Sequence, residues 1–216
     1  MKRRDFSLQL AGAGLGLAVI GAARAQGGAP VEGQQYARLS PPVAPTVPAS
    51  KKVEVIEFFS YACPHCYAFE PVLEPWIKRL PADVYFHPVP VGFVAGRTWV
   101  PKVFYALEEI GQREAMHVKL FAAMHVQHLP MISEAEVTKF LVSEGVDGGK
   151  LDQALKSFAV NTKVNRASTL LGGYKISGVP TLGVQGRYTV EGAVDGSHER
   201  ALVVADYLIQ RTRQGA

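Results

Sequence analysis

The sequence predicts an α/β fold in which an α-helical subdomain is inserted between two parts of a sheet domain. Three observations support this prediction. The run VEVIEFF at residues 53–59 is short, β-branched and aromatic, which is typical of a central strand buried on both faces. Residues 98–175 have mainly helical patterns. A hairpin and a final amphipathic helix follow them, so the chain returns to the sheet after the helices.

The first 25 residues are predicted to form a cleaved export signal. Lys2, Arg3 and Arg4 are basic, residues 8–23 are apolar with interspersed glycines, and the segment Ala23-Arg24-Ala25 has the small-x-small pattern of a cleavage site. A membrane-spanning helix is the alternative, but this run is too short and too rich in glycine. The Arg3-Arg4 pair partly resembles a twin-arginine signal, so the export route stays open.

The charge of the chain lies mostly in this export signal. Four basic residues and one acidic residue give residues 1–25 a net charge of +3, out of +4 for the whole chain. The remainder lacks the clustered basic surface that nucleic-acid binding requires. Residues 26–50 are predicted to form an extended N-terminal arm, since prolines at 41, 42, 45 and 48 disfavour regular structure there.

Residues 51–97 are predicted to form the first part of the sheet domain. After the strand at 53–59, residues 60–62 turn the chain, and Pro64 favours the first position of a helix, which makes Cys63 its N-cap. A second apolar run at residues 84–91 predicts another strand. The helix presents an apolar stripe to the sheet, formed by Phe69, Leu73, Trp76 and Leu80.

The helical subdomain at residues 98–175 has its own boundaries. Helices are expected at residues 99–110, 134–144, 151–158 and 160–171. Gly111 and Gly145 are typical C-terminal stops, and Ser133 with Glu136 fits a capping box. Residues 176–216 then complete the sheet domain, with a hairpin that turns near Gln185-Gly186 and a helix at residues 198–212.

The only two cysteines of the chain, Cys63 and Cys66, lie in the motif CPHC. A disulfide between them would close too small a loop to stabilise the fold appreciably. A structural zinc site needs further Cys or His ligands in a second pair, and haem attachment needs a histidine where Tyr67 stands. Reversible thiol chemistry or an inert pair therefore remains.

Two further groups of polar residues have competing interpretations. Glu57, within the apolar strand, is either an edge residue facing solvent or a buried acid beneath the dithiol that exchanges protons. His117, His125 and His128 could share a helix face and suggest a metal site, but no carboxylate or cysteine completes the set. Solvated histidines are the favoured interpretation.

Four features occur together in the sequence: the segment EFFSYACPHCYAFEP, the helical insertion, the Gly178-Val179-Pro180 segment before a hairpin, and the C-terminal helix. In this combination the sequence resembles the DsbA family of periplasmic thiol:disulfide oxidoreductases. The resemblance covers about residues 36–213 and implies a thioredoxin-like fold. It implies that Cys63 is the nucleophile and Cys66 the resolving thiol, with Pro64 and His65 as the tuning dipeptide and Pro180 as a cis-proline. Glu57 falls at the buried acidic position of the family. Its usual companion, a lysine on the next strand, is not evident around Phe86-His87.

Elementary electrostatics at the helix start is consistent with an oxidant. Unpaired backbone N–H groups and the positive end of the helix dipole stabilise a thiolate at Cys63, and His65 can add a donor or a charge. A depressed pKa of Cys63 favours the reduced form of the dithiol. The disulfide is therefore readily reduced by a thiol of a client, meaning a protein that the enzyme would oxidise. The DsbA family is itself the reference case for a very low cysteine pKa and a high reduction potential.

The resulting expectation is a monomeric periplasmic enzyme that oxidises the dithiols of unfolded or partly folded exported proteins. Client backbone is expected to lie antiparallel to the Val179-Pro180 segment. The family resemblance implies reoxidation by a quinone-linked membrane protein of the DsbB type, and no bound cofactor or metal. The alternatives are a disulfide isomerase or reductase on the same fold, and a peptide-binding chaperone with an inert disulfide.

Overall fold

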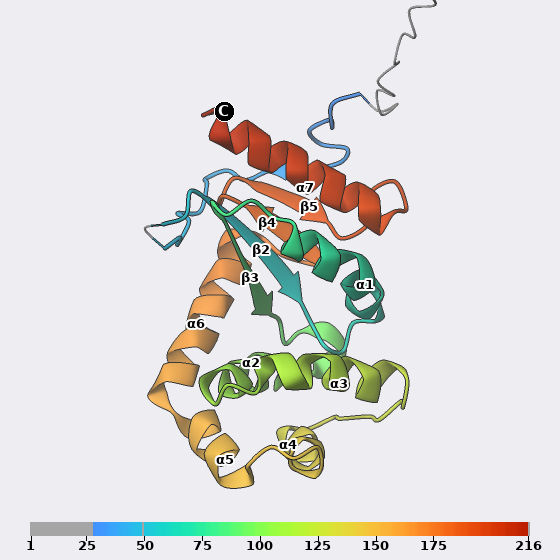
Figure 1. Ribbon diagram of the computed structural model, residues 1–216, viewed down its shortest axis with the longest axis vertical. Coiled ribbons are helices and arrows are strands. Elements are labelled where there is room, and N and C mark those ends of the chain that lie inside the picture. Colours follow the sequence, from blue (N-terminus) through green and yellow to red (C-terminus); the bar gives the residue numbers. More distant parts are fainter. Residues whose placement is uncertain (1–27, 49, 216) are drawn as a thin grey trace, which may run out of the picture.

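A computed structural model describes residues 28–48 and 50–215, so the predicted export signal at residues 1–25 lies outside the described part of the chain. Within that part the strands form one sheet with the order β1-β5-β4-β2-β3 (Figure 1). Strands β2 and β3 are parallel, and the other neighbouring pairs are antiparallel. The strands are β1 (Ala37–Arg38), β2 (Val53–Phe59), β3 (Val84–Pro90), β4 (Thr181–Val184) and β5 (Tyr188–Glu191).

Strand β2 is buried along its whole length, as the sequence predicts for a central strand. Its alternating side chains enter two different cores: Val53 and Val55 pack in one, and Ile56 and Phe58 in the other. Strand β3 lies at the sheet edge, where proline is tolerated because edge strands have unpaired backbone positions.

Helices α1 (Pro64–Lys78) and α7 (His198–Arg213) cover one face of the sheet (Figure 1). Both were predicted, and α7 ends one residue beyond its predicted range. The core beneath them excludes water from a large apolar surface, which is the main stabilising contribution to this layer. It includes Val53, Val55, Phe69, Leu73, Trp76, Leu182, Val184, Val204 and Leu208.

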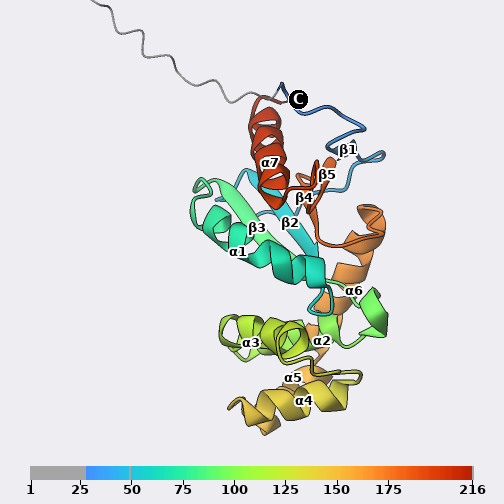
Figure 2. The same cartoon turned by 90° about the vertical axis from the view of Figure 1, so that its right-hand side faces the viewer.

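Five α-helices lie between β3 and β4: α2 (Val100–Glu109), α3 (Arg113–His125), α4 (Glu134–Ser143), α5 (Gly148–Lys156) and α6 (Phe158–Gly173). In Figures 1 and 2, α2 to α5 gather beyond the carboxyl ends of β2 and β3, and α6 returns alongside the sheet. No helix in residues 28–48 and 50–215 is long and apolar enough to cross a membrane.

The predicted capping box at the start of α4 is formed only in part. Ser133 Oγ accepts a hydrogen bond from the Glu136 backbone N–H at 3.3 Å, as expected. The Glu136 carboxylate, however, accepts from the Ile132 N–H at 2.6 Å instead of from Ser133 itself. Two backbone N–H groups at the start of α4 still have acceptors, so the N-terminus of the helix is capped by a variant of the predicted motif.

The β4–β5 hairpin turns at Gln185 and Gly186, which confirms the predicted position. Both residues have positive φ, of 52° and 62°, as the common two-residue hairpin turn requires. The N-terminal arm crosses this turn: the Val43 N–H donates to the Gly186 carbonyl at 2.8 Å, and β1 pairs with β5. A side chain at position 186 would collide with the Val43 carbonyl.

Candidate active site

The two thiols lie where β2 passes into α1. The chain leaves β2 at Phe59, turns, and begins α1 at Pro64, so Cys63 is the N-cap, as predicted. Its backbone is extended, with φ −94° and ψ 117°, and no side chain caps the helix end. Both Cys63 and Cys66 are free thiols, and Cys66 is fully buried, whereas Cys63 retains 5% of its exposure. Only the first thiol is therefore open to a partner.

The cis-proline loop faces the first thiol. The Val179–Pro180 peptide bond is cis, as the resemblance implies. The Cys63 thiol donates a hydrogen bond to the Val179 carbonyl at 3.3 Å, although 116 residues separate them. A cleft of about 630 Å³ is lined by His65, Val179 and Pro180 together with residues of the N-terminal arm and β5. The predicted site residues on both sides of the thiol are thus brought together.

The pKa of Cys63 is lowered to about 6. The largest cause is a hydrogen bond from the Cys66 thiol, followed by the backbone N–H groups of Cys66 and His65 and the charge of His65, while burial opposes them. The backbone donors are the unpaired N–H groups of the first helical turn, as expected from the sequence, whereas the larger contribution of the Cys66 thiol was not expected. Cys63 is accordingly mostly a thiolate at neutral pH, and its hydrogen bond to the Val179 carbonyl belongs to the protonated form.

The second thiol has the opposite electrostatics. Burial raises the pKa of Cys66, and its hydrogen bond to Cys63 and the negative charge of Glu57 raise it further. Cys66 therefore stays protonated while Cys63 is ionised, and the two sulfurs three residues apart differ in reactivity.

Glu57 is a buried acid, which resolves the two interpretations left open by the sequence. Its side chain is 2% exposed, and Pro88 of β3 and Leu182 of β4 flank it in the sheet. Burial raises the pKa of Glu57 well above its usual range, with further contributions from the charges of Glu70 and Cys63. Among the described residues, its Oε1 atom has no hydrogen-bond partner.

The expectation of solvated histidines is wrong for two of the three. His117 Nδ1 lies 3.0 Å from the Tyr61 hydroxyl, and its Nε2 lies 3.3 Å from Glu70 Oε2. His125 Nε2 donates to the Tyr61 carbonyl at 2.8 Å, and its ring stacks on Tyr67. Both therefore contact the turn before Cys63. His128 lies beyond the end of α3 and is exposed.

Tyr61 and Glu70 are site residues that sequence patterns did not identify. Tyr61 is fully buried, with its ring 5.1 Å from that of Phe121. A signal was present in α3, because positions 117, 121 and 125 are spaced four apart and share one helix face. That spacing identifies the face, but only the tertiary structure shows that it packs on the active-site turn.

Comparison with known proteins places these features in a family. A family model described as DSBA-like thioredoxin domain matches residues 89–200. The thiol:disulfide interchange protein DsbA of Pseudomonas aeruginosa is 39% identical over 186 residues, which cover 85% of this chain and 86% of that protein. The protein of the same name from Bordetella pertussis is 36% identical over 217 residues, covering 99% of this chain and 100% of that one.

Solved structures agree with the sequence comparisons. The crystal structure of Pseudomonas aeruginosa DsbA matches with a TM-score of 0.79 and 37% identity, covering 86% of this chain and 95% of that chain. The oxidoreductase DsbA from Xylella fastidiosa matches with a TM-score of 0.75 and 30% identity, covering 86% and 98%.

Proposed function

Because the chain belongs to the DSBA-like thioredoxin domain family, we propose that it is a periplasmic thiol:disulfide oxidase that introduces disulfides into exported proteins. The fold class that the sequence predicts, thioredoxin-like with an inserted helical subdomain, is that of the DsbA structures it matches. The chain is a thiol:disulfide oxidoreductase, and the proposal concerns its residues, direction, partners and location.

The contrast between the two thiols is the observation that carries the proposal. A pKa of about 6 at Cys63 makes the reduced form favourable and the sulfur a good leaving group. The disulfide form is correspondingly a ready electron acceptor. Pro64 and His65 tune this position, since one fixes the helix start and the other adds a backbone donor and a charge.

The proposed cycle starts from the Cys63–Cys66 disulfide. A client thiolate attacks Cys63 Sγ, the Cys63–Cys66 bond breaks, and Cys66 leaves and takes up a proton. A second client thiolate then attacks the client sulfur of the mixed disulfide, which releases Cys63 as a thiolate and leaves the client with a disulfide. Two electrons pass from the client to the enzyme.

Client backbone is proposed to bind along the cis-proline loop. Val179 and Pro180 line the cleft of about 630 Å³ next to Cys63, together with His65. In the dithiol form the Val179 carbonyl accepts a hydrogen bond from Cys63, so the loop lies within contact distance of a sulfur bound to a client. Backbone pairing at such a site recognises little sequence, which suits an enzyme with many clients.

The proposal extends to the surroundings of the enzyme. Export through residues 1–25 would deliver a monomer to the periplasm, with residues 26–50 as an arm and residues 98–175 as the inserted subdomain. Reoxidation requires an electron acceptor, for which a quinone-linked membrane protein of the DsbB type is proposed.

The alternative functions make different demands on the dithiol. An isomerase or reductase would need a dithiol that is kept reduced, and a chaperone with an inert disulfide would not need a depressed pKa at Cys63.

The test is the reduction potential of residues 26–216, equilibrated against glutathione, together with a titration of the Cys63 thiolate by its ultraviolet absorbance. The proposal predicts a potential well above that of thioredoxin and an ionisation at acidic pH that is absent from Cys63→Ser. A thioredoxin-like potential with a near-neutral ionisation would instead favour a reductase or isomerase. Client binding that is unchanged when both cysteines are serine, without any client oxidation by the wild-type protein, would favour the chaperone.

A further inference from the structure

The cis-proline loop, residues 178–180, has three carbonyl groups with different donors. The first carbonyl accepts from the Thr181 hydroxyl at 2.9 Å, and the last accepts from the Gly192 N–H at 2.8 Å. The middle carbonyl, that of Val179, accepts from Cys63 while this thiol is protonated. In the thiolate and in the disulfide the sulfur has no proton to donate, so the middle carbonyl is available to a backbone N–H of a client.

Gly192 is the point at which the end of β5 contacts the cis-proline loop. It directly follows the last residue of β5 and is buried. A Cβ atom at position 192 would collide with the ring of Pro180. The proline therefore packs directly on the backbone of Gly192, and any shift of that backbone would move the loop relative to the dithiol.

His198, the first residue of α7, holds the backbone of Gly192 from the other side. Its Nδ1 lies 2.5 Å from the Gly192 carbonyl oxygen, and because a carbonyl can only accept, Nδ1 carries the proton of this hydrogen bond. The same ring packs against the fully buried Phe69 of α1, with centroids 5.3 Å apart. His198 also lines the cleft of about 630 Å³ beside Cys63. One side chain thus connects the helix that carries the dithiol to the support of the cis-proline loop.

The start of α7 is capped without the His198 side chain. Ser197 Oγ accepts from the Arg200 N–H at 3.1 Å and donates to Glu199 Oε2 at 2.8 Å. The hydrogen bond from His198 to Gly192 is additional to this cap, so the two can be removed separately.

We propose that His198 is a positioning residue for client oxidation: by holding the Gly192 carbonyl, it fixes the cis-proline loop where the Val179 carbonyl can pair with client backbone next to Cys63. The inference rests on the proposed function, because it takes clients to bind along this loop. A client thiolate then attacks Cys63 with its backbone already oriented. A small thiol compound has no backbone to pair, so it gains nothing from the position of the loop.

The experiment compares two reductants of the oxidised protein. One is a short synthetic peptide with two cysteines, and the other is dithiothreitol, which has no peptide backbone. Each gives up two electrons and becomes a disulfide, while the Cys63–Cys66 disulfide becomes a dithiol. Samples are quenched with acid at intervals, and mass spectrometry of the alkylated protein gives the second-order rate constant for each reductant.

Three variants separate the hydrogen bond from the fold. His198→Phe keeps a ring beside Phe69 but has no donor for Gly192. His198→Asn restores a donor, since its amide nitrogen is as many bonds from the backbone as Nδ1. Ser197→Ala is the matched control, because it removes the cap of the same helix end and leaves the hydrogen bond to Gly192 in place.

His198→Phe is expected to lower the rate constant for the peptide about tenfold and to leave that for dithiothreitol within about twofold of the wild type. His198→Asn should recover most of the rate constant for the peptide. Ser197→Ala should lower the stability in urea, as loss of a cap does, and keep the ratio of the two rate constants. Gly192→Ala, whose side chain would press on Pro180, should lower that ratio as His198→Phe does.

Three outcomes would overturn the proposal. One is an unchanged rate constant for the peptide in His198→Phe. Another is an equal loss for both reductants, which would mean that His198 only supports the fold. The third is a loss in Ser197→Ala that matches the loss in His198→Phe, which would assign the effect to the helix end. Urea unfolding of each variant confirms that folded proteins are compared.

A titration of the Cys63 thiolate separates a failure of this role from a failure of the oxidase proposal, because it needs no client. A displaced loop no longer offers the Val179 carbonyl to the protonated thiol, so in His198→Phe the midpoint should move to lower pH by about half a unit. A wild-type protein that does not oxidise the peptide would contradict the oxidase proposal. The titration would still decide whether His198 holds the loop against Cys63, and an unchanged midpoint would show that it does not.

Discussion

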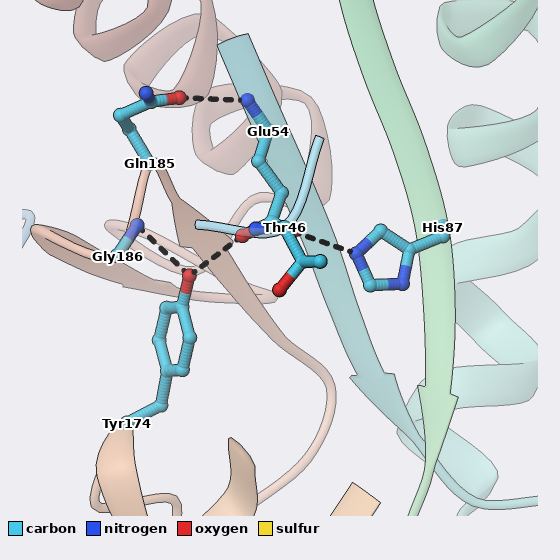
Figure 3. Close-up of polar contacts among 6 residues, drawn as sticks. All are labelled: Thr46, Glu54, His87, Tyr174, Gln185 and Gly186. Atoms are coloured by element: carbon cyan, nitrogen blue, oxygen red, sulfur yellow. Dashed lines mark hydrogen bonds and ion pairs between the residues drawn. The ribbon is translucent and has the colours of Figure 1, made fainter. Parts of the chain in front are cut away.

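Strand β2 carries two buried glutamates three residues apart, and their surroundings differ completely. Glu54 and Glu57 are each 2% exposed. Because side chains alternate along a strand, an odd spacing places them on opposite faces of the sheet. Glu57 lies beneath the dithiol with an oxygen that has no partner among the described residues, whereas Glu54 is surrounded by hydrogen-bonding groups (Figure 3).

The partners of Glu54 come from distant parts of the chain. Its Oε1 accepts from the Thr46 N–H at 3.0 Å and lies 3.2 Å from His87 Nε2, and its Oε2 accepts from the Tyr174 hydroxyl at 3.5 Å. The Tyr174 hydroxyl also accepts from the Gly186 N–H at 2.9 Å. One carboxylate thus joins the arm, the edge strand, the end of α6 and the hairpin turn. A buried acid with hydrogen-bond partners holds distant segments together, whereas a buried acid without them is costly to the fold.

Replacing Glu54 by alanine should give the largest loss of stability. The substitution leaves the part-buried Thr46 N–H and the buried Tyr174 hydroxyl without their acceptor, and we expect a loss of about 3 kcal/mol in the free energy of unfolding. Urea denaturation measures it. The reduction potential should stay unchanged, since Glu54, unlike Glu57, is not among the groups that shift the pKa of Cys63 or Cys66. A shifted potential with unchanged stability would reverse the assignment of roles to the two glutamates.

Replacing Glu57 by leucine should have the opposite sign. The variant removes an acid that is buried without full compensation, so the free energy of unfolding should rise by about 1 to 2 kcal/mol at neutral pH. The native state binds the Glu57 proton more tightly than the unfolded chain does, so the wild type loses stability as the pH rises above the usual carboxyl value of 4.5. The advantage of the variant should therefore grow with pH over that range. A variant less stable than the wild type at pH 7 would mean that Glu57 has partners that stabilise its charge.

Replacing Tyr174 by phenylalanine should have a smaller effect within the Glu54 cluster. The ring still packs against Phe58, with centroids 5.1 Å apart, but the variant lacks the hydroxyl that accepts from the Gly186 N–H and donates to Glu54 Oε2. A loss of about 1 kcal/mol is expected, mostly from the shorter of the two hydrogen bonds, to Gly186. In combination with Glu54→Ala the two losses should not add, which a double-mutant cycle would detect. Full additivity would show that the two side chains act independently.

Local sequence was sufficient for the parts of the site that are close in the chain. The apolar run at 53–59, Pro64 at a helix start and the CPHC motif together predicted a buried strand that leads to a thiol at an N-cap. The cis bond before Pro180 came from the family resemblance, since X-Pro bonds are rarely cis in general.

The environment of each buried acid could not be predicted in this way. Pattern alone left Glu57 between an edge position and a buried one, and its burial follows from the pairing of β2 with β3 on one side and β4 on the other. The partners of the Glu54 carboxylate lie 8 to 120 residues away in sequence. His117 and Tyr61, separated by 56 residues, meet only because α3 packs on the active-site turn. Periodicity gives the buried face of an element but not the neighbour that covers it.

The most direct test of the account is the stability of the reduced and oxidised proteins as a function of pH, measured by guanidinium unfolding. In the reduced protein, Cys63 has a pKa of about 6 when folded and an ordinary value of 9.0 when unfolded. Between these values the unfolded chain binds more protons, so the reduced form should gain up to about 1.4 kcal/mol per pH unit relative to the oxidised form, which lacks the titrating thiol. This contribution is lost as the pH falls through about 6. A stability difference that does not change over this range would contradict the claim that the fold stabilises the Cys63 thiolate.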